Sequence, residues 1–150
     1  MTDNPTAGIA VLQPLLQQFR VGNCAYVDEA GICHGANLRA VSEWFQLADA
    51  FIDYGAHGSW NGAATRVPMK VLIDGEPGFN QIKLEKNSAA GSATSECDFY
   101  FTNGRNIGTA ASRAPTAGRV WHHLFHPVNI DRHQVGVTVT GARFSTIMNW

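Results

Sequence analysis

Residues 38–52 of the chain read LRAVSEWFQLADAFI and carry its clearest structural pattern. Apolar side chains recur here at steps of three, three, one, three, three and one, the spacing of one helix face; they are Leu38, Val41, Trp44, Phe45, Ala48, Phe51 and Ile52. The pattern predicts a long amphipathic helix whose apolar stripe faces the core.

Weaker patterns precede and follow this helix. Leu15, Leu16 and Phe19 are spaced for a short helix over residues 14–20, which Pro14 would begin. Residues 21–35 contain three glycines and two of the cysteines, and residues 55–64 contain three more glycines. We expect irregular backbone in both stretches.

After residue 64 the apolar pattern changes to the alternation of strands. We expect strands at residues 67–73, 79–84 and 97–102, a loop at 105–118, an apolar segment with three histidines at 120–128 and a hairpin at 135–148. Because helices come first and strands follow, the predicted class is α+β. N-terminal helices, including the long central one, would pack on a C-terminal antiparallel sheet in a single domain of residues 1–150.

Composition excludes several functions. Charged residues make up 15% of the 150 residues and the net charge is −1, which argues against a nucleic-acid partner. The first ten residues lack a basic segment followed by an apolar run, and no stretch is long enough to cross a bilayer, so we expect no signal peptide and no membrane partner. Three cysteines leave at least one thiol unpaired and favour a reducing compartment.

The end of the chain brings a histidine opposite an asparagine. Residues 133–139 read HQVGVTV, and a three-residue loop centred on Gly141 would return the chain as a second strand. In that register Val139 faces Arg143, and His133 faces Asn149. Cβ atoms of such a pair lie about 4.5–5.5 Å apart. The Asn149 amide would therefore hold one tautomer of His133, which would act as a general base.

A nucleophilic thiol would complete this site. Cys33 lies shortly before the long predicted helix, and a thiolate at a helix N-terminus is stabilised by unpaired backbone N–H groups and the helix dipole. Gly31 and Gly35 on either side would let a substrate backbone come close. These features favour Cys33, whereas Cys97 lies in a predicted strand and is expected to belong to the core.

Two parts of the chain together resemble the papain-like cysteine proteases. Gly31-Ile32-Cys33 leading into a helix with Trp44-Phe45 is similar to the YopT-like secreted effector proteases. The strand beginning at His133 and the sequence FSTIMNW at residues 144–150 resemble the histidine and asparagine strands of papains and staphopains. In those families a tryptophan shields the histidine–asparagine hydrogen bond. The resemblance implies a papain-like fold and a triad of Cys33, His133 and Asn149.

The same family pattern keeps Cys24 open as the alternative nucleophile. Papains place a glutamine that helps to form the oxyanion hole six residues before the nucleophile. Gln18 stands six residues before Cys24, whereas the residue six before Cys33 is Val27. Against Cys24, the stretch that follows it leaves room for at most two helical turns before Gly31, where papains have a long helix.

The sequence WHHLFH at residues 121–126 favours a different chemistry. A double histidine after an aromatic residue resembles HNH-type toxin nucleases, so a metal-dependent nuclease that uses His122, His123 and His126 is one alternative. In a strand His122 and His126 would lie about 13 Å apart, too far to share one ion, and we expect no metal here. A non-enzymatic binding domain with ordinary thiols is the other alternative.

The sequence thus predicts a cysteine-dependent hydrolase, a protease or deamidase, that acts on an amide bond of a protein or peptide without a cofactor. Transfer of the acyl group to another acceptor would instead make it a related thiol acyl-transfer enzyme, an acyltransferase or transglutaminase. The resemblance implies a bacterial effector or toxin, secreted without a cleavable signal peptide and acting in the cytosol of a target cell. An inhibitor or immunity protein would be a further partner. A cytoplasmic protein is the alternative.

Overall fold

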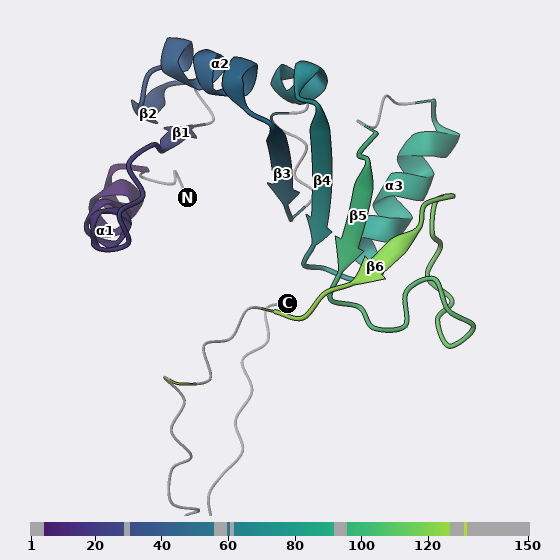
Figure 1. Ribbon diagram of the computed structural model, residues 1–150. Coiled ribbons are helices and arrows are strands. Elements are labelled where there is room, and N and C mark those ends of the chain that lie inside the picture. The colour runs from purple at the N-terminus through teal and green to yellow at the C-terminus, as the bar shows by residue number, and fades with distance from the viewer. Residues whose placement is uncertain are drawn as a thin grey trace, which may run out of the picture.

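The computed structural model describes residues 5–28, 31–55, 60, 62–91, 96–126 and 131 (Figure 1). Its elements, in chain order, are α1 (Pro5–Gln18), β1 (Ala25–Val27), β2 (Cys33–Gly35), α2 (Leu38–Leu47), β3 (Ala50–Tyr54), the 3-10 helix η1 (Ala63–Arg66), β4 (Met69–Asp74), α3 (Phe79–Ala89), β5 (Phe99–Thr102) and β6 (Trp121–His123). No described helix is both long and apolar enough to span a bilayer.

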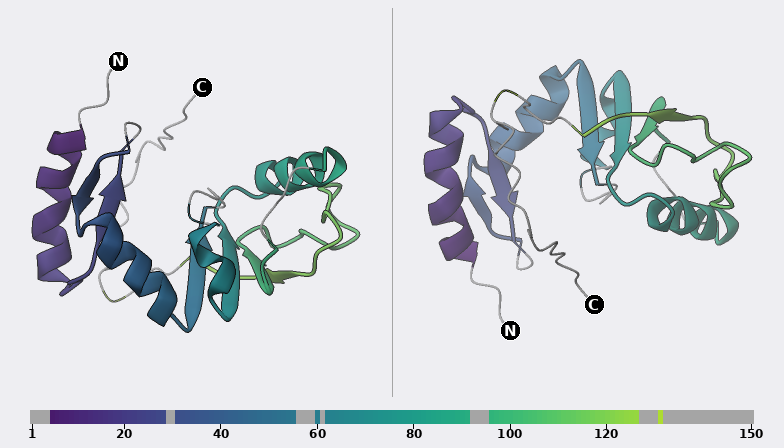
Figure 2. Two further views of the ribbon diagram at one scale, coloured as in Figure 1. Left: turned by 90° about the horizontal axis from the view of Figure 1, so that it is seen from above. Right: turned by 90° about the horizontal axis from the view of Figure 1, so that it is seen from below.

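The strands form two separate sheets. Strands β1 and β2 make an antiparallel pair, and the other four make a parallel sheet in the order β3-β4-β5-β6. Helix α1 lies beside the antiparallel pair at one end of the molecule, and α3 lies beside the parallel sheet at the other, with α2 between them (Figure 2). The chain is therefore of mixed helix and sheet class, which agrees with the α+β prediction at that level.

The strand direction in the larger sheet differs from the prediction. Its four described strands run parallel, whereas the predicted papain-like fold has an antiparallel sheet. Strands β4 and β5 confirm the predictions at residues 67–73 and 97–102 within two residues at each end. Parallel neighbours need a crossover between them, and α3 supplies it between β4 and β5. The predicted hairpin at residues 135–148 lies outside the described residues.

Helix α3 replaces the strand predicted at residues 79–84. Its buried side chains are the polar Asn80 and Gln81, which are 2% and 0% exposed, while Phe79 and Ile82 are 63% and 45% exposed. Both amides bind the Asp74 carboxylate at the end of β4. The buried face of this helix is polar. The spacing of its apolar residues therefore did not indicate a helix.

Helix α2 confirms the predicted amphipathic helix but ends earlier. It stops at Leu47, and Ala48 takes an extended conformation that leads into β3. Phe51 and Ile52, the last members of the apolar stripe, therefore belong to a strand. Pairing with β4 decides this, because Phe51 and Ile52 lie opposite Lys70 and Val71 in the sheet.

Helix α1 extends further toward the N-terminus than the pattern indicates. The prediction places Pro14 at its start, but the helix begins at Pro5 and contains Pro14. Proline inside a helix removes one hydrogen bond donor, and the remaining turns continue to Gln18.

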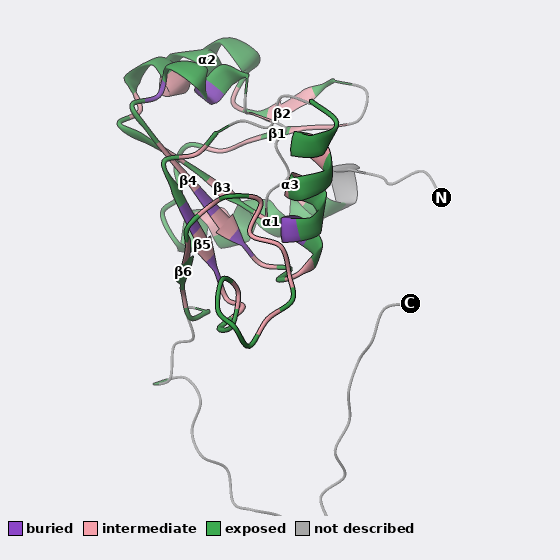
Figure 3. Cartoon of the chain, turned by 90° about the vertical axis from the view of Figure 1, so that its right-hand side faces the viewer, coloured by how far each residue is buried: buried purple, intermediate pink, exposed green. Residues whose placement is uncertain are grey.

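The buried residues form two small groups (Figure 3). Val41 of α2 is buried with Ala64 and Val67, on and directly after η1. Leu72 and Tyr100 are neighbours on the face of the parallel sheet that also carries Asp74 and Thr102. The β1–β2 pair lies apart from both groups, and it carries the candidate site described next.

Candidate functional site

The β1–β2 hairpin carries two cysteines within a few residues of each other. Its register pairs Ala25 with Gly35, Tyr26 with His34 and Val27 with Cys33. Two further backbone hydrogen bonds extend the ladder, from Ala36 N to the Cys24 carbonyl at 2.9 Å and from Asp28 N to the Ile32 carbonyl at 3.0 Å. The hairpin thus orders the chain from Cys24 to Asp28 against its return strand.

One face of this hairpin gathers a thiol, an imidazole and a carboxylate. Successive side chains of a strand alternate between faces, so Cys24, Tyr26 and Asp28 share one face. His34 lies opposite Tyr26 on that face, and their ring centroids are 6.0 Å apart. Cys24 and Asp28 are therefore its two diagonal neighbours.

Cys24 and His34 line the same apolar pocket. This pocket, of about 190 Å³, lies between the hairpin and helix α1; α1 stands beside the hairpin in both views of Figure 2. Helix α1 contributes three aliphatic side chains and the amide of Gln13. A cysteine, a histidine and a glutamine are thus among the residues that line one pocket.

His34 makes a direct contact with Asp28, one of its two diagonal neighbours. His34 Nε2 lies 2.9 Å from Asp28 Oδ2. Because an ionised carboxylate only accepts, Nε2 carries the proton and donates. Asp28 Oδ1 accepts from Ile32 N at 2.9 Å, and its side chain is only 14% exposed. The carboxylate is thus anchored by the turn, and it sets which nitrogen of His34 is protonated.

Gly35 lets the return strand approach Cys24 closely. Its φ is +86°, and a Cβ at this position would lie 2.6 Å from the Cys24 carbonyl oxygen. Only glycine meets both conditions without strain. This residue therefore sets how closely Cys24 lies to the strand that carries His34.

Cys33 lies shortly before α2, at the first position of strand β2. It lies four residues before Asn37, whose side chain caps α2 by accepting from Ala40 N at 2.9 Å. Its thiol donates to the Ala36 carbonyl at 2.8 Å. In the hairpin register Cys33 faces Val27, on the side away from His34. The N-terminus of α2, which was expected to activate the Cys33 thiol, is capped by the Asn37 side chain.

Cys97 has the environment of an unreactive thiol. It is half-buried directly before β5, and its N–H donates to the Tyr100 hydroxyl at 2.9 Å. Burial, together with the nearby Asp53 carboxylate, raises the pKa of the Cys97 thiol above its ordinary value. The prediction placed Cys97 in a strand of the core, whereas it lies two residues before β5 and is only half-buried.

The other predicted site residues are not brought together in the described part of the chain. Gln18, the predicted oxyanion residue, is exposed at the last position of α1, and Gln13 from the same helix lines the Cys24 pocket instead. His133 and Asn149 lie outside the described residues.

The three histidines of the alternative nuclease site lie apart from one another. His122 and His123 are on opposite faces of β6, opposite Phe101 and Thr102. His126 forms a hydrogen bond with the Asn103 side chain. Among the described residues, no group of three or more His, Cys, Asp or Glu side chains is arranged to hold a metal ion.

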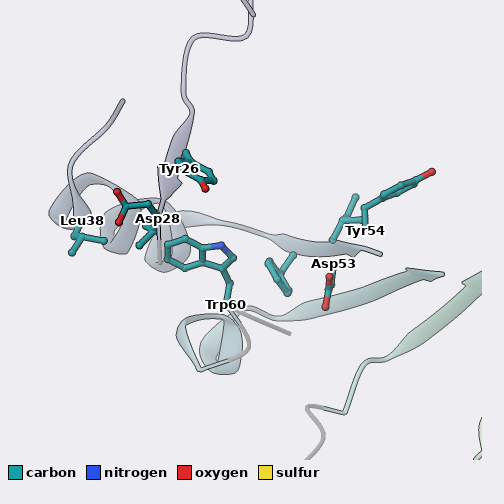
Figure 4. Close-up of a pocket in the computed structure, with 9 residues that line it drawn as sticks. Tyr26, Asp28, Leu38, Asp53, Tyr54 and Trp60 are labelled. Atoms are coloured by element: carbon teal, nitrogen blue, oxygen red, sulfur yellow. The ribbon is translucent and has the colours of Figure 1, made fainter. Parts of the chain in front are cut away.

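A larger cleft adjoins the hairpin at Tyr26, Val27 and Asp28. Its volume is about 680 Å³, and it lies between the hairpin, the start of α2 and strand β3 (Figure 4). Tyr26 belongs to the walls of both this cleft and the Cys24 pocket, and Asp28 belongs to the cleft and to the His34 contact. The two cavities therefore adjoin each other at Tyr26.

Sequence reasoning missed His34 and Asp28. The signal was present in residues 25–34, where two short β-prone runs, AYV and ICH, flank a turn that contains Gly31 at φ +79°. Three-residue strands are too short for a clear alternation. The hairpin, and with it the His34–Asp28 pair, therefore became visible only in three dimensions.

Comparisons of the chain with protein-family models, with curated proteins and with solved structures gave no match.

Proposed function

We propose that this protein is a cysteine-dependent hydrolase that acts on an amide bond of a protein or peptide, with Cys24 as nucleophile, His34 as base and Asp28 as the residue that orients His34. One observation carries the proposal: Cys24 and His34 line one pocket, while His34 Nε2 is bound to Asp28 at 2.9 Å. A nucleophile, a base and a group that orients the base are the parts that thiol catalysis needs.

The reaction follows from these positions. Because Asp28 holds Nε2–H, Nδ1 of His34 is the nitrogen that takes the proton of Cys24. The thiolate attacks the carbonyl carbon, and the Gln13 amide donates to the oxyanion that forms. Collapse breaks the C–N bond as His34 returns its proton to the leaving amine. Water then attacks the thioester, His34 takes a proton from it, and the acid and the free thiol are released.

The resemblance to papain-like effector proteases supports the same type of reaction, attack by a cysteine thiolate on an amide carbonyl. The predicted triad of Cys33, His133 and Asn149 is a second arrangement of the same reaction. Cys24 and His34 have the stronger support because they share a pocket, whereas the Cys33 thiol is engaged with the Ala36 carbonyl. The resemblance also supports a secreted effector acting in the cytosol of a target cell, with an inhibitor or immunity protein as partner.

The test compares single variants of the full chain. Hydrolysis of fluorescein-labelled casein would report protease activity, and ammonia release from the same casein would report deamidase activity. We expect Cys24→Ala and His34→Ala to lower either rate by at least about 10²-fold, and Cys33→Ala and Cys97→Ala to retain it. Circular dichroism would confirm that each variant is folded.

The same series separates the two arrangements. If Cys33→Ala and His133→Ala abolish hydrolysis while Cys24→Ala and His34→Ala do not, the predicted triad is the working one. If all four variants keep the activity of the parent, the protein is not a cysteine-dependent hydrolase. Iodoacetamide labelling at pH 6, read by mass spectrometry, is expected to modify Cys24 fastest, because only an activated thiol reacts quickly there.

A further inference from the structure

The cleft beside the hairpin has the size of a ligand site. Its volume of about 680 Å³ lies within the range of about 300–1,000 Å³ typical of such sites. Its walls come from elements distant in sequence, with Tyr26 and Asp28 on the hairpin, Leu38 at the start of α2, and Asp53 and Tyr54 on β3. Trp60 closes the wall next to the hairpin (Figure 4).

The walls combine aromatic rings with negative charge. Tyr26, Tyr54 and Trp60 are its aromatic residues, and Asp28 and Asp53 are its acidic ones. Both oxygens of Asp28 already accept hydrogen bonds, from Ile32 N and His34 Nε2. Of the described residues that line the cleft, none is lysine, arginine or histidine. Trp60 is held in place by stacking on Phe45 of α2, with ring centroids 5.8 Å apart. Aromatic faces and carboxylates both attract a cation, and they reinforce each other where water is partly excluded.

We infer that this cleft binds a lysine or arginine side chain of the substrate peptide, next to the bond that Cys24 attacks. The aliphatic stem of such a side chain would pack on Leu38 and the rings, while its charged head would lie near the Asp53 carboxylate. The position of this side chain next to the cleaved bond rests on the proposed function. Binding of a basic side chain in the cleft does not depend on catalysis.

The spacing along β1 supports the connection between the two cavities. Tyr26 lines both of them, and Cys24 lies two residues before it, which corresponds to about 7 Å along a strand. An extended peptide advances by about the same amount in two residues. The basic residue would therefore lie within about two residues of the cleaved bond.

The binding experiment uses the full chain with Cys24→Ala, so that no turnover occurs. Isothermal titration calorimetry would measure acetyl-Ala-X-Ala-amide peptides in which X is lysine, arginine, norleucine or glutamate. Norleucine keeps the aliphatic stem of lysine and removes the charge. We expect the lysine and arginine peptides to bind at least about tenfold more tightly than the norleucine peptide, and the glutamate peptide to bind most weakly.

Variants then locate the site. Asp53→Asn and Tyr54→Val, each combined with Cys24→Ala, should reduce the preference for lysine over norleucine at least about threefold. Glu85→Gln removes one negative charge at an exposed position on α3, away from the cleft, and should leave that preference unchanged. Thermal unfolding would show that the variants are folded, and Tyr54→Val serves as the second probe because Tyr54 is 56% exposed on its strand.

The outcomes of binding and turnover are distinguishable. Equal affinity for lysine and norleucine peptides, no binding of any peptide at millimolar concentration, or an unchanged preference in both cleft variants would overturn the cation site. Selective lysine binding without any hydrolysis by the parent chain would support the cation site and refute the hydrolase. Hydrolysis without a preference for basic residues near the cleaved bond would leave the hydrolase and refute the cleft as its subsite.

Discussion

His34 Nε2 donates to Asp28 Oδ2 across the β1–β2 hairpin at 2.9 Å, and the same aspartate anchors the turn through Ile32 N. The contact holds the ring in one tautomer on the face that also carries Cys24. The Asp28 carboxylate therefore both orients the proposed base and stabilises the turn of the hairpin.

Replacing Asp28 by asparagine should separate these two roles. The amide oxygen of Asp28→Asn can still accept from Ile32 N, so the hairpin should form, but an amide stabilises the imidazolium less than a carboxylate does. We expect kcat for casein hydrolysis to fall by about 10²-fold or more, with a smaller change in KM. An unchanged kcat in a folded variant would show that Asp28 does not act through His34.

Gly35→Ala should destabilise the hairpin. The new Cβ would lie 2.6 Å from the Cys24 carbonyl oxygen at a φ of +86°, and such strain costs about 1–3 kcal/mol in the free energy of unfolding. Gly62→Ala is the matched control, because Gly62 has a φ of −62° and no described neighbour within 4 Å of the place that a new Cβ would take. Urea unfolding should place the control within about 1 kcal/mol of the parent.

Asp74→Ala should be among the most destabilising changes in the parallel sheet. Asp74 is 1% exposed and accepts from Asn80 Nδ2 at 2.6 Å, Gln81 Nε2 at 2.8 Å and Thr102 Oγ1 at 2.8 Å. Its removal leaves two buried amides without their acceptor, at about 1–3 kcal/mol each. We expect a loss of at least about 3 kcal/mol by urea unfolding, against about 0.5 kcal/mol or less for Asp49→Ala at an exposed position.

The Cys97 thiol should react only at alkaline pH. Because burial raises its pKa, the folded chain keeps the proton at pH values where an ordinary thiol, with a pKa of about 8.5, has already lost it. Iodoacetamide labelling of Cys97 should therefore rise at higher pH than labelling of the same cysteine in urea. The same shift destabilises the fold as pH rises above about 8.5, and Cys97→Ala should remove that part of the decline.

A chelator should leave hydrolysis unchanged. EDTA in excess is expected to have no effect on casein hydrolysis, because the proposed chemistry uses a thiol and an imidazole. His123→Ala should likewise keep the activity of the parent. Loss of activity with EDTA, restored by a divalent metal, would instead favour the histidines of residues 121–126 as the working site.

Local patterns were sufficient for several elements of the fold. The apolar spacing of residues 38–47 predicted α2, the apolar runs at 67–73 and 97–102 predicted β4 and β5, and the stretch at 105–118, composed largely of small residues (Gly, Ala and Ser), predicted a loop. Each of these signals depends on side-chain periodicity or backbone preference over a few consecutive residues, so the sequence alone carries it.

Helix α3 and the end of α2 show where such reasoning fails. Helix α3 buries Asn80 and Gln81 against Asp74, so its inward face has the polarity expected of a surface. Phe51 and Ile52 continue a helical spacing yet pair with β4. In both cases a partner distant in the sequence overrides the local pattern.

The sequence by itself determined that this protein has a helix over 38–47, β-prone segments after residue 64 and an odd number of cysteines, one or more of which stays unpaired. Only the tertiary structure decided the parallel direction of the larger sheet, the polar burial around Asp74, and the position of His34 between Cys24 and Asp28. The reason is physical: periodicity is local, whereas strand direction, hairpin register and hydrogen-bond partners depend on which segments meet in space.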